Sequence, residues 1–163
     1  TYANVVFHYG IEEFCARAAE VGVDGLILPD VPFEEKEEFA GPCRAHGMDL
    51  VSMIAPTSEE RIDTIARDAE GFIYCVSSLG VTGTRSSITT DLDSIVARIC
   101  AVTDTPIAIG FGISNPEQAA IMAAKSDGAI VGSAIVKIIA AEGENAVLTV
   151  GEFARKMVEA VRA

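Results

Sequence analysis

The sequence contains no tryptophan, and aromatic residues make up only 6% of its 163 residues. A core with so few aromatic side chains must be built from Ile, Val, Leu and Ala, which suits parallel strands buried on both faces. Positive charge is scarce as well, since 12 Lys and Arg stand against 24 Asp and Glu, for a net charge of -12. We therefore expect no nucleic-acid partner, because binding to a phosphate backbone needs clustered basic side chains.

Paired cysteines and long apolar runs are also missing. Cys15, Cys43, Cys75 and Cys100 form no CxxC pair and have no histidine at metal-ligand spacing. This pattern predicts reduced, mostly buried thiols and no metal site. No apolar run approaches the length of a membrane span, and no segment has the pattern of a secretory signal. We therefore expect a cytoplasmic protein without a membrane partner.

The sequence does contain a repeated alternation of short apolar runs and amphipathic helical patterns. The runs are bounded by Gly, Pro or Asp and predict strands over residues 25–30, 49–56, 71–77, 105–110 and 128–132. Helices are predicted over 11–21, 33–46, 91–102, 133–141 and 150–161, and after the candidate N-caps Ser58 and Asn115, the latter followed by Pro116. Strict alternation of this kind implies a parallel sheet with right-handed crossovers.

Both a doubly wound sheet and a (β/α)8 barrel fit this alternation, and no linker divides residues 1–163 into domains. Three glycine-rich segments follow predicted strands: GVTG at 80–83, GFGIS at 110–114 and GSAIVK at 132–137. A Gly-Ser step that opens a helix directs free N–H groups at an anion, and many barrels bind phosphate after their last two strands. The pattern therefore favours a barrel. A complete barrel has eight strands and about 250 residues, so we expect a partial one.

Together with TYAN at 1–4 and LPDVP at 28–32, these segments resemble the tryptophan synthase alpha chain family in order and spacing. The resemblance covers essentially the whole chain. It implies an α/β fold, a partial (β/α)8 TIM barrel with strands four to eight present and strands one to three missing. It also implies aldol cleavage of indole-3-glycerol phosphate to indole and glyceraldehyde 3-phosphate, without a cofactor, and a beta chain as partner.

The resemblance assigns roles to individual residues. The positions that match the phosphate-binding residues are Gly83, Gly112, Gly132 and Ser133. The positions that match residues around the indole are Tyr2, Tyr74 and Phe111. Thr82 matches a loop residue that meets a catalytic carboxylate when the loop closes. The segments that contact the beta chain in the family contain Asn4, Phe7 and Pro32.

The family's catalytic Glu, and the Asp that supports the indole, match no residue of this chain. Retro-aldol cleavage needs a positioned acid and base, so we expect the chain to be inactive alone. Asp30, at the end of a predicted strand, is either an acid or base of another barrel enzyme or a turn carboxylate. Two alternatives stay open: another phosphate-binding barrel, such as a sugar-phosphate isomerase or an indole-glycerol-phosphate synthase relative, and a non-catalytic partner module. Unpaired edges of a five-stranded sheet also predict self-association or poor stability.

Overall fold

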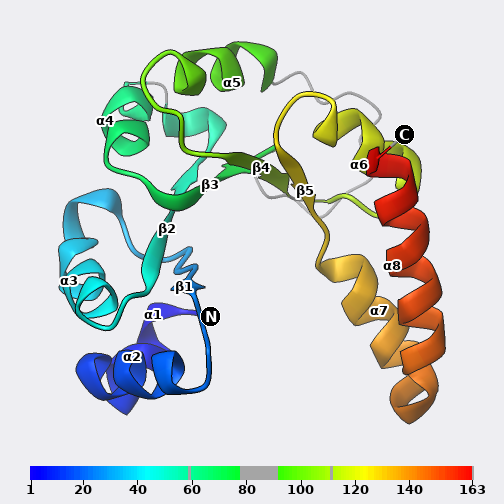
Figure 1. The fold of residues 1–163 in the computed structure, drawn as a ribbon, viewed down its shortest axis with the longest axis horizontal. Coiled ribbons are helices and arrows are strands. Elements are labelled where there is room, and N and C mark those ends of the chain that lie inside the picture. Colours follow the sequence, from blue (N-terminus) through cyan, green and yellow to red (C-terminus); the bar gives the residue numbers. More distant parts are fainter. Residues whose placement is uncertain (59, 78–91, 111, 163) are drawn as a thin grey trace.

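The computed structural model describes residues 1–58, 60–77, 92–110 and 112–162. These residues form one parallel sheet of five strands, whose order in space follows the sequence. The strands are Gly25–Leu26 (β1), Asp49–Ile54 (β2), Glu70–Val76 (β3), Ile107–Gly110 (β4) and Gly128–Ile130 (β5). The sheet curves into an open arc with helices along its outside (Figure 1). A doubly wound sheet reverses its strand order part-way, so the arrangement is that of a partial barrel.

Helices precede, connect and follow these strands. The α-helices are Ala3–Tyr9 (α1), Ile11–Glu20 (α2), Glu37–Ala45 (α3), Ile62–Arg67 (α4), Leu92–Cys100 (α5), Pro116–Ala123 (α6), Ser133–Glu142 (α7) and Ala146–Arg162 (α8). The described residues also form the short 3-10 helices Phe33–Glu35 (η1), Pro56–Ser58 (η2) and Gly143–Asn145 (η3). The predicted start of α6 is confirmed, because the Asn115 side chain accepts a hydrogen bond from the Gln118 N–H at 2.9 Å and Pro116 lies in the first turn.

Several predicted boundaries are wrong. Ser58 does not cap a helix: its hydroxyl accepts the Ala55 N–H at 3.3 Å within a 3-10 turn, and α4 begins later, at Ile62. The helix predicted over 33–46 is divided at Lys36 into η1 and α3. The first strand pairs with β2 only at Gly25 and Leu26. It stops before the turn that contains Pro29, which has no N–H for a strand ladder. Helix α8 begins four residues before the predicted start at 150.

The outer face of the sheet carries the largest core. Ile54, Cys75 and Ile109 are register partners on β2, β3 and β4, and all three are fully buried. They belong to a cluster with buried apolar side chains of α4 and α5, such as Ile62 and Ile99. A second cluster joins α1, α2, β1, α3 and β2, and a smaller one lies between α6 and α8. The core therefore follows the arc on its helical side.

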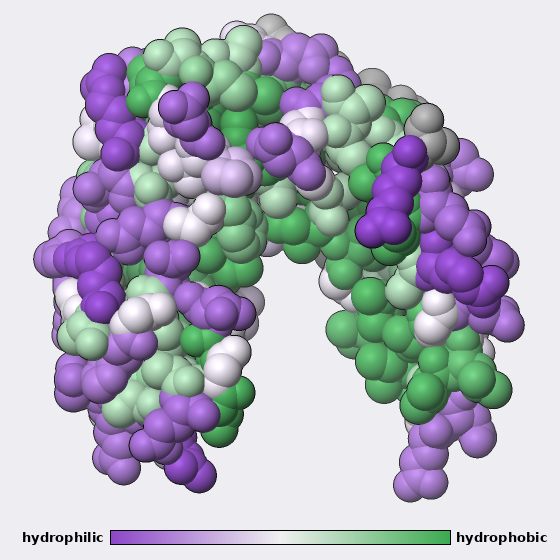
Figure 2. All heavy atoms as spheres, in the orientation of Figure 1, coloured by the Kyte–Doolittle hydropathy of each residue, from purple (hydrophilic) through white to green (hydrophobic). Residues whose placement is uncertain are grey.

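The inner face of the arc is only partly covered. Met53, Tyr74, Ala108 and Gly128 form one row across β2 to β5, and each is half-buried. Within the described ranges, β1 and β5 each pair with one neighbour only. Figure 2 shows a hollow between the two arms of the arc and apolar side chains over the arm that carries α7 and α8. The unpaired edges and this half-buried row agree with the fold predicted from the sequence.

Candidate functional site

The ends of β4 and β5 bring two of the predicted phosphate loops together. Gly110 and Ile130 are register partners at the carboxyl ends of these adjacent parallel strands. The segments that follow, residues 112–114 and 131–133, therefore leave the same edge of the sheet from neighbouring strands. This edge is where parallel α/β proteins and barrels place their ligands.

The loop after β4 is fixed in place by the start of α6. Ile113 is buried in the cluster between α6 and α8. The backbone N–H and the hydroxyl of Ser114 donate to Oε1 of Gln118 at 2.8 and 3.1 Å. Gly112, between this anchor and β4, is exposed and has a φ of +79°, a backbone conformation that glycine adopts without strain. The sequence thus holds an exposed backbone turn beside the end of β5.

The segment after β5 opens directly into a helix. Ser133 is the first residue of α7, Gly132 is its N-cap, and both are exposed. The first N–H groups of a helix have no acceptor within the helix, and the helix dipole makes that end favourable for an anion. A side chain at Gly132 would meet nothing within 4 Å, so the approach to these groups is open. Such a site needs no basic side chain, which suits a chain with a net charge of -12.

Tyr74 lies on the inner face, next to these strand ends. An ideal Cβ built on Gly110 would lie 2.6 Å from Cζ and 2.8 Å from Cε1 of Tyr74. The Tyr74 ring therefore lies directly against the backbone of Gly110. Burial raises the pKa of the Tyr74 phenol. An aromatic ring is thus positioned one strand away from Gly112 and two strands away from Ser133.

The remaining predicted residues lie at the other end of the arc. Tyr2, Asn4, Phe7 and Pro32 are all exposed, on or beside α1 and in the segment after β1. They lie beyond β1, several strands away from β4 and β5. The structure therefore gathers Tyr74, Gly112, Gly132 and Ser133 at one end of the sheet. The predicted partner-facing residues lie apart from them, and so does Tyr2, which the resemblance places beside the indole.

Asp30 has a structural role. The backbone N–H of Ala3 donates to both carboxylate oxygens of Asp30, at 3.0 and 3.2 Å. This carboxylate therefore holds the amino end of α1 close to the end of β1, where a helix terminus favours negative charge. Of the two interpretations of Asp30, the structure supports the turn carboxylate. The sequence did not indicate this contact, because α1 itself was not predicted.

Thr82, Gly83 and Phe111 lie outside the described residues. Their predicted roles in loop closure, phosphate binding and indole packing stay predictions.

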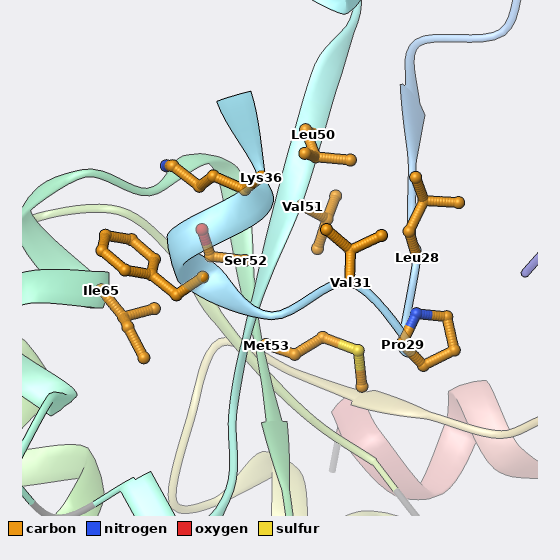
Figure 3. A pocket seen from close by; sticks show the side chains of 10 residues that line it. Leu28, Pro29, Val31, Lys36, Leu50, Val51, Ser52, Met53 and Ile65 are labelled. Carbon is orange, nitrogen blue, oxygen red and sulfur yellow. The ribbon is translucent and has the colours of Figure 1, made fainter. Parts of the chain in front are cut away.

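A small pocket lies elsewhere, between β1, β2 and η1 (Figure 3). Its volume is about 70 Å³, and its lining is mainly apolar, including Leu28, Val31 and Met53. Lys36 is the charged residue of this lining; it forms an ion pair with Asp68 and lies 5.0 Å from the centre of the Phe33 ring. Ligand pockets usually have volumes of about 300–1,000 Å³ with convergent polar groups. We therefore do not assign a ligand to this pocket.

The described part of the chain shows neither a metal cluster nor a membrane span. It contains no group of three or more His, Cys, Asp and Glu side chains that could hold a metal ion. It also contains no helix that is long and apolar enough to span a membrane.

The sequence model of the family described as tryptophan synthase alpha chain matches residues 1–162. The chain belongs to the tryptophan synthase alpha chain family. A curated relative, the tryptophan synthase alpha chain of Lacticaseibacillus casei, is 45% identical over 163 residues, which are 100% of this chain and 61% of that protein.

Solved structures show the same relationship in three dimensions. Tryptophan synthase from Mycobacterium tuberculosis matches with a TM-score of 0.86 and 34% identity, over 100% of this chain and 61% of that chain. The tryptophan synthase a2b2 complex from Pyrococcus furiosus contains a chain with a TM-score of 0.83 and 32% identity, over 98% of this chain and 65% of that one.

The chain spans 52% to 61% of the length of the curated tryptophan synthase alpha chains that it matches. Together with the strand order of the sheet, the structural similarity confirms the fold predicted from the sequence, a partial TIM barrel of this family.

Proposed function

We propose that this chain provides the phosphate-binding and indole-facing wall of a tryptophan synthase alpha chain. In this proposal the substrate is indole-3-glycerol phosphate. The phosphate binds the backbone of Gly112, Gly132 and Ser133, and the indole lies toward Tyr74. The observation that supports this assignment best is the adjacency of the β4 and β5 ends, with α7 beginning at Ser133.

The chemistry of the reaction defines what the chain can contribute. Retro-aldol cleavage delivers a proton to the indole ring carbon and removes one from the glycerol hydroxyl. None of the described residues beside Gly112 and Ser133 matches the family's catalytic Glu. We therefore propose that the chain binds and orients the substrate but does not cleave it alone. As a biosynthetic enzyme component acting on a phosphorylated small molecule, it is assigned to the cytoplasm.

A beta chain is the proposed macromolecular partner. The Pyrococcus furiosus relative is described as part of an a2b2 complex. The candidate contact residues Asn4, Phe7 and Pro32 are all exposed here, and Phe7 is 62% exposed, which is high for a large apolar side chain. Val5 and Tyr9 of the same helix are exposed as well, and a group of exposed apolar side chains often marks a protein interface.

Calorimetric titration with indole-3-glycerol phosphate and with inorganic phosphate tests the phosphate site. We expect both to bind the unmodified chain and Ser133→Asp to weaken both by at least about tenfold, because like charges a few ångströms apart repel by more than about 1.4 kcal/mol. Ala140→Asp is the matched control, since it adds the same charge to an exposed position near the other end of α7. Equal weakening by both variants would reject a phosphate site at Ser133.

An indole-release assay tests the catalytic part of the proposal. The purified chain should bind indole-3-glycerol phosphate without releasing indole. Measurable turnover by the chain alone would refute the proposal that it lacks the catalytic acid. Tighter binding of an open-chain sugar phosphate than of indole-3-glycerol phosphate would instead favour a different phosphate-binding barrel.

A further inference from the structure

Two buried thiols meet at the contact between α2 and α3. The Sγ atoms of Cys15, on α2, and Cys43, on α3, are 3.7 Å apart. Both side chains are 0% exposed. A disulfide has an S–S distance of about 2.05 Å, so the two sulfur atoms are already in contact and bonding needs only a short further approach.

The surroundings of this pair are apolar and connect several elements. Cys15 and Cys43 belong to the cluster that also contains Val6 of α1, Leu26 of β1 and Phe39 of α3. The pKa of the Cys43 thiol is raised to about 12, mainly by burial and to a smaller extent by the neighbouring Cys15. The thiolate is the reactive form, so Cys43 reacts slowly with oxidants at neutral pH, and exposed Cys100 is more accessible.

We propose that Cys15 and Cys43 form a redox modification site, at which hydrogen peroxide or a similarly small peroxide produces a disulfide between α2 and α3. One thiolate attacks the peroxide, breaks its O–O bond and becomes a sulfenic acid while the first water leaves. The second thiol attacks that sulfur, forms the S–S bond and releases the second water. The two thiols together lose two electrons and two protons, and hydrogen peroxide is reduced to two water molecules.

The disulfide would tether α2 to α3 across 28 residues of sequence. A cross-link of this span stabilises a protein mainly by restricting the unfolded chain. The disulfide would also limit the movement of the buried cluster in which Val6 anchors α1. The expected result is a rise in Tm of about 5–10 °C that is reversed by reduction. This inference concerns the helices beside β1 and does not depend on the proposed phosphate site.

Peptide mapping of the unmodified chain tests the proposal directly. The folded chain is treated with hydrogen peroxide, its remaining thiols are alkylated after unfolding, and it is digested with trypsin. We expect a cross-linked species that joins the tryptic peptides 1–17 and 37–44, lighter than the two reduced peptides together by two hydrogen masses. Recovery of Cys15 and Cys43 as alkylated thiols, or as sulfinic and sulfonic acids, would overturn the proposal.

Two variants make the stability measurement specific. Cys100→Ser removes the exposed thiol and with it disulfides between molecules. In this background, Cys75→Ala removes a buried thiol outside the pair and should keep the peroxide-dependent rise in Tm. Cys43→Ala should abolish that rise. A rise of the same size in the Cys43→Ala variant would also contradict the proposal.

Discussion

Replacing Gly110 with alanine should force the Tyr74 ring out of its position on the inner face. The new Cβ would lie 2.6 Å from Cζ and 2.8 Å from Cε1 of Tyr74. Carbon atoms in contact prefer a separation of about 3.5–4.0 Å, so the ring must retreat by roughly 1 Å. Overpacking of this kind lowers the free energy of unfolding by about 1–3 kcal/mol. Replacing glycine also makes the unfolded chain less flexible, which raises the free energy of unfolding by about 0.5–1 kcal/mol.

A double-mutant cycle separates these two contributions. In the Tyr74→Ala background the clash is absent, so Gly110→Ala should be neutral or stabilising by about 0.5 kcal/mol. The coupling free energy between the two positions should therefore be about 1–3 kcal/mol. Urea denaturation followed by far-ultraviolet circular dichroism measures each free energy of unfolding, provided that the m-value is unchanged.

Gly128 provides the matched control. It lies on β5, in the same inner row as Tyr74, and a Cβ there would come no closer than 3.9 Å to its neighbour Ala108. Gly128→Ala should therefore change the free energy of unfolding by less than about 0.5 kcal/mol or increase it slightly. If Gly110→Ala has the same effect with and without the Tyr74 ring, the described packing of that ring is wrong.

Three further sets of substitutions and one solution measurement test other parts of the structure. Ile109→Ala, at a fully buried position, should lower the free energy of unfolding by about 2–5 kcal/mol. The control Val136→Ala, at a position 63% exposed, should change it by less than about 0.5 kcal/mol. Urea denaturation measures both values. Asp30→Ala should cost about 1 kcal/mol in the same assay through the lost α1 cap, and Asp30→Asn should retain most of that stability. A hydrogen bond from Arg98 lowers the pKa of Asp63 below its ordinary value of 3.8. The Asp63 carboxylate therefore adds to the stability of the folded chain above pH 3.8, and this gain is lost as the pH falls through the lowered pKa. The difference in free energy of unfolding between the unmodified chain and Asp63→Asn should accordingly shrink between pH about 6 and about 3. Light scattering should detect self-association through the unpaired edges of β1 and β5, and a well-behaved monomer would contradict that expectation.

The order and number of described strands were predictable because each is a short apolar run bounded by turn residues. The start of α6 was predictable for the same kind of reason, since the Asn115 cap and Pro116 act within one turn of the chain. Local signals of this type need no knowledge of the rest of the molecule.

Features that depend on contacts across the fold were not predictable. Helix α1 is anchored by buried Val6 and capped by Asp30, which is 27 residues from Ala3 in sequence. Ser58 has the residue type of an N-cap, but its hydroxyl bonds Ala55 instead. The close approach of Cys15 to Cys43 likewise follows from the packing of α2 on α3, and no spacing in the sequence indicates it.

The meeting of two glycine-rich loops was predictable from the sequence, but the geometry around them was not. Glycine-rich segments after two strands indicated a phosphate site, and the register of β4 and β5 brings Gly112 and Ser133 to neighbouring strand ends. The ring of Tyr74 over Gly110 could not be predicted, because it depends on which face of β3 points into the arc.

A two-dimensional ¹⁵N–¹H NMR titration with inorganic phosphate tests most directly whether Gly112, Gly132 and Ser133 bind one anion, since it reports on each backbone amide separately. We expect the amide signals of Gly112, Gly132 and Ser133 to shift together and to saturate at one common phosphate concentration, while the amides of α1 and α2 stay in place. Unshifted signals from all three residues, or shifts confined to other parts of the chain, would contradict a shared anion site at the ends of β4 and β5.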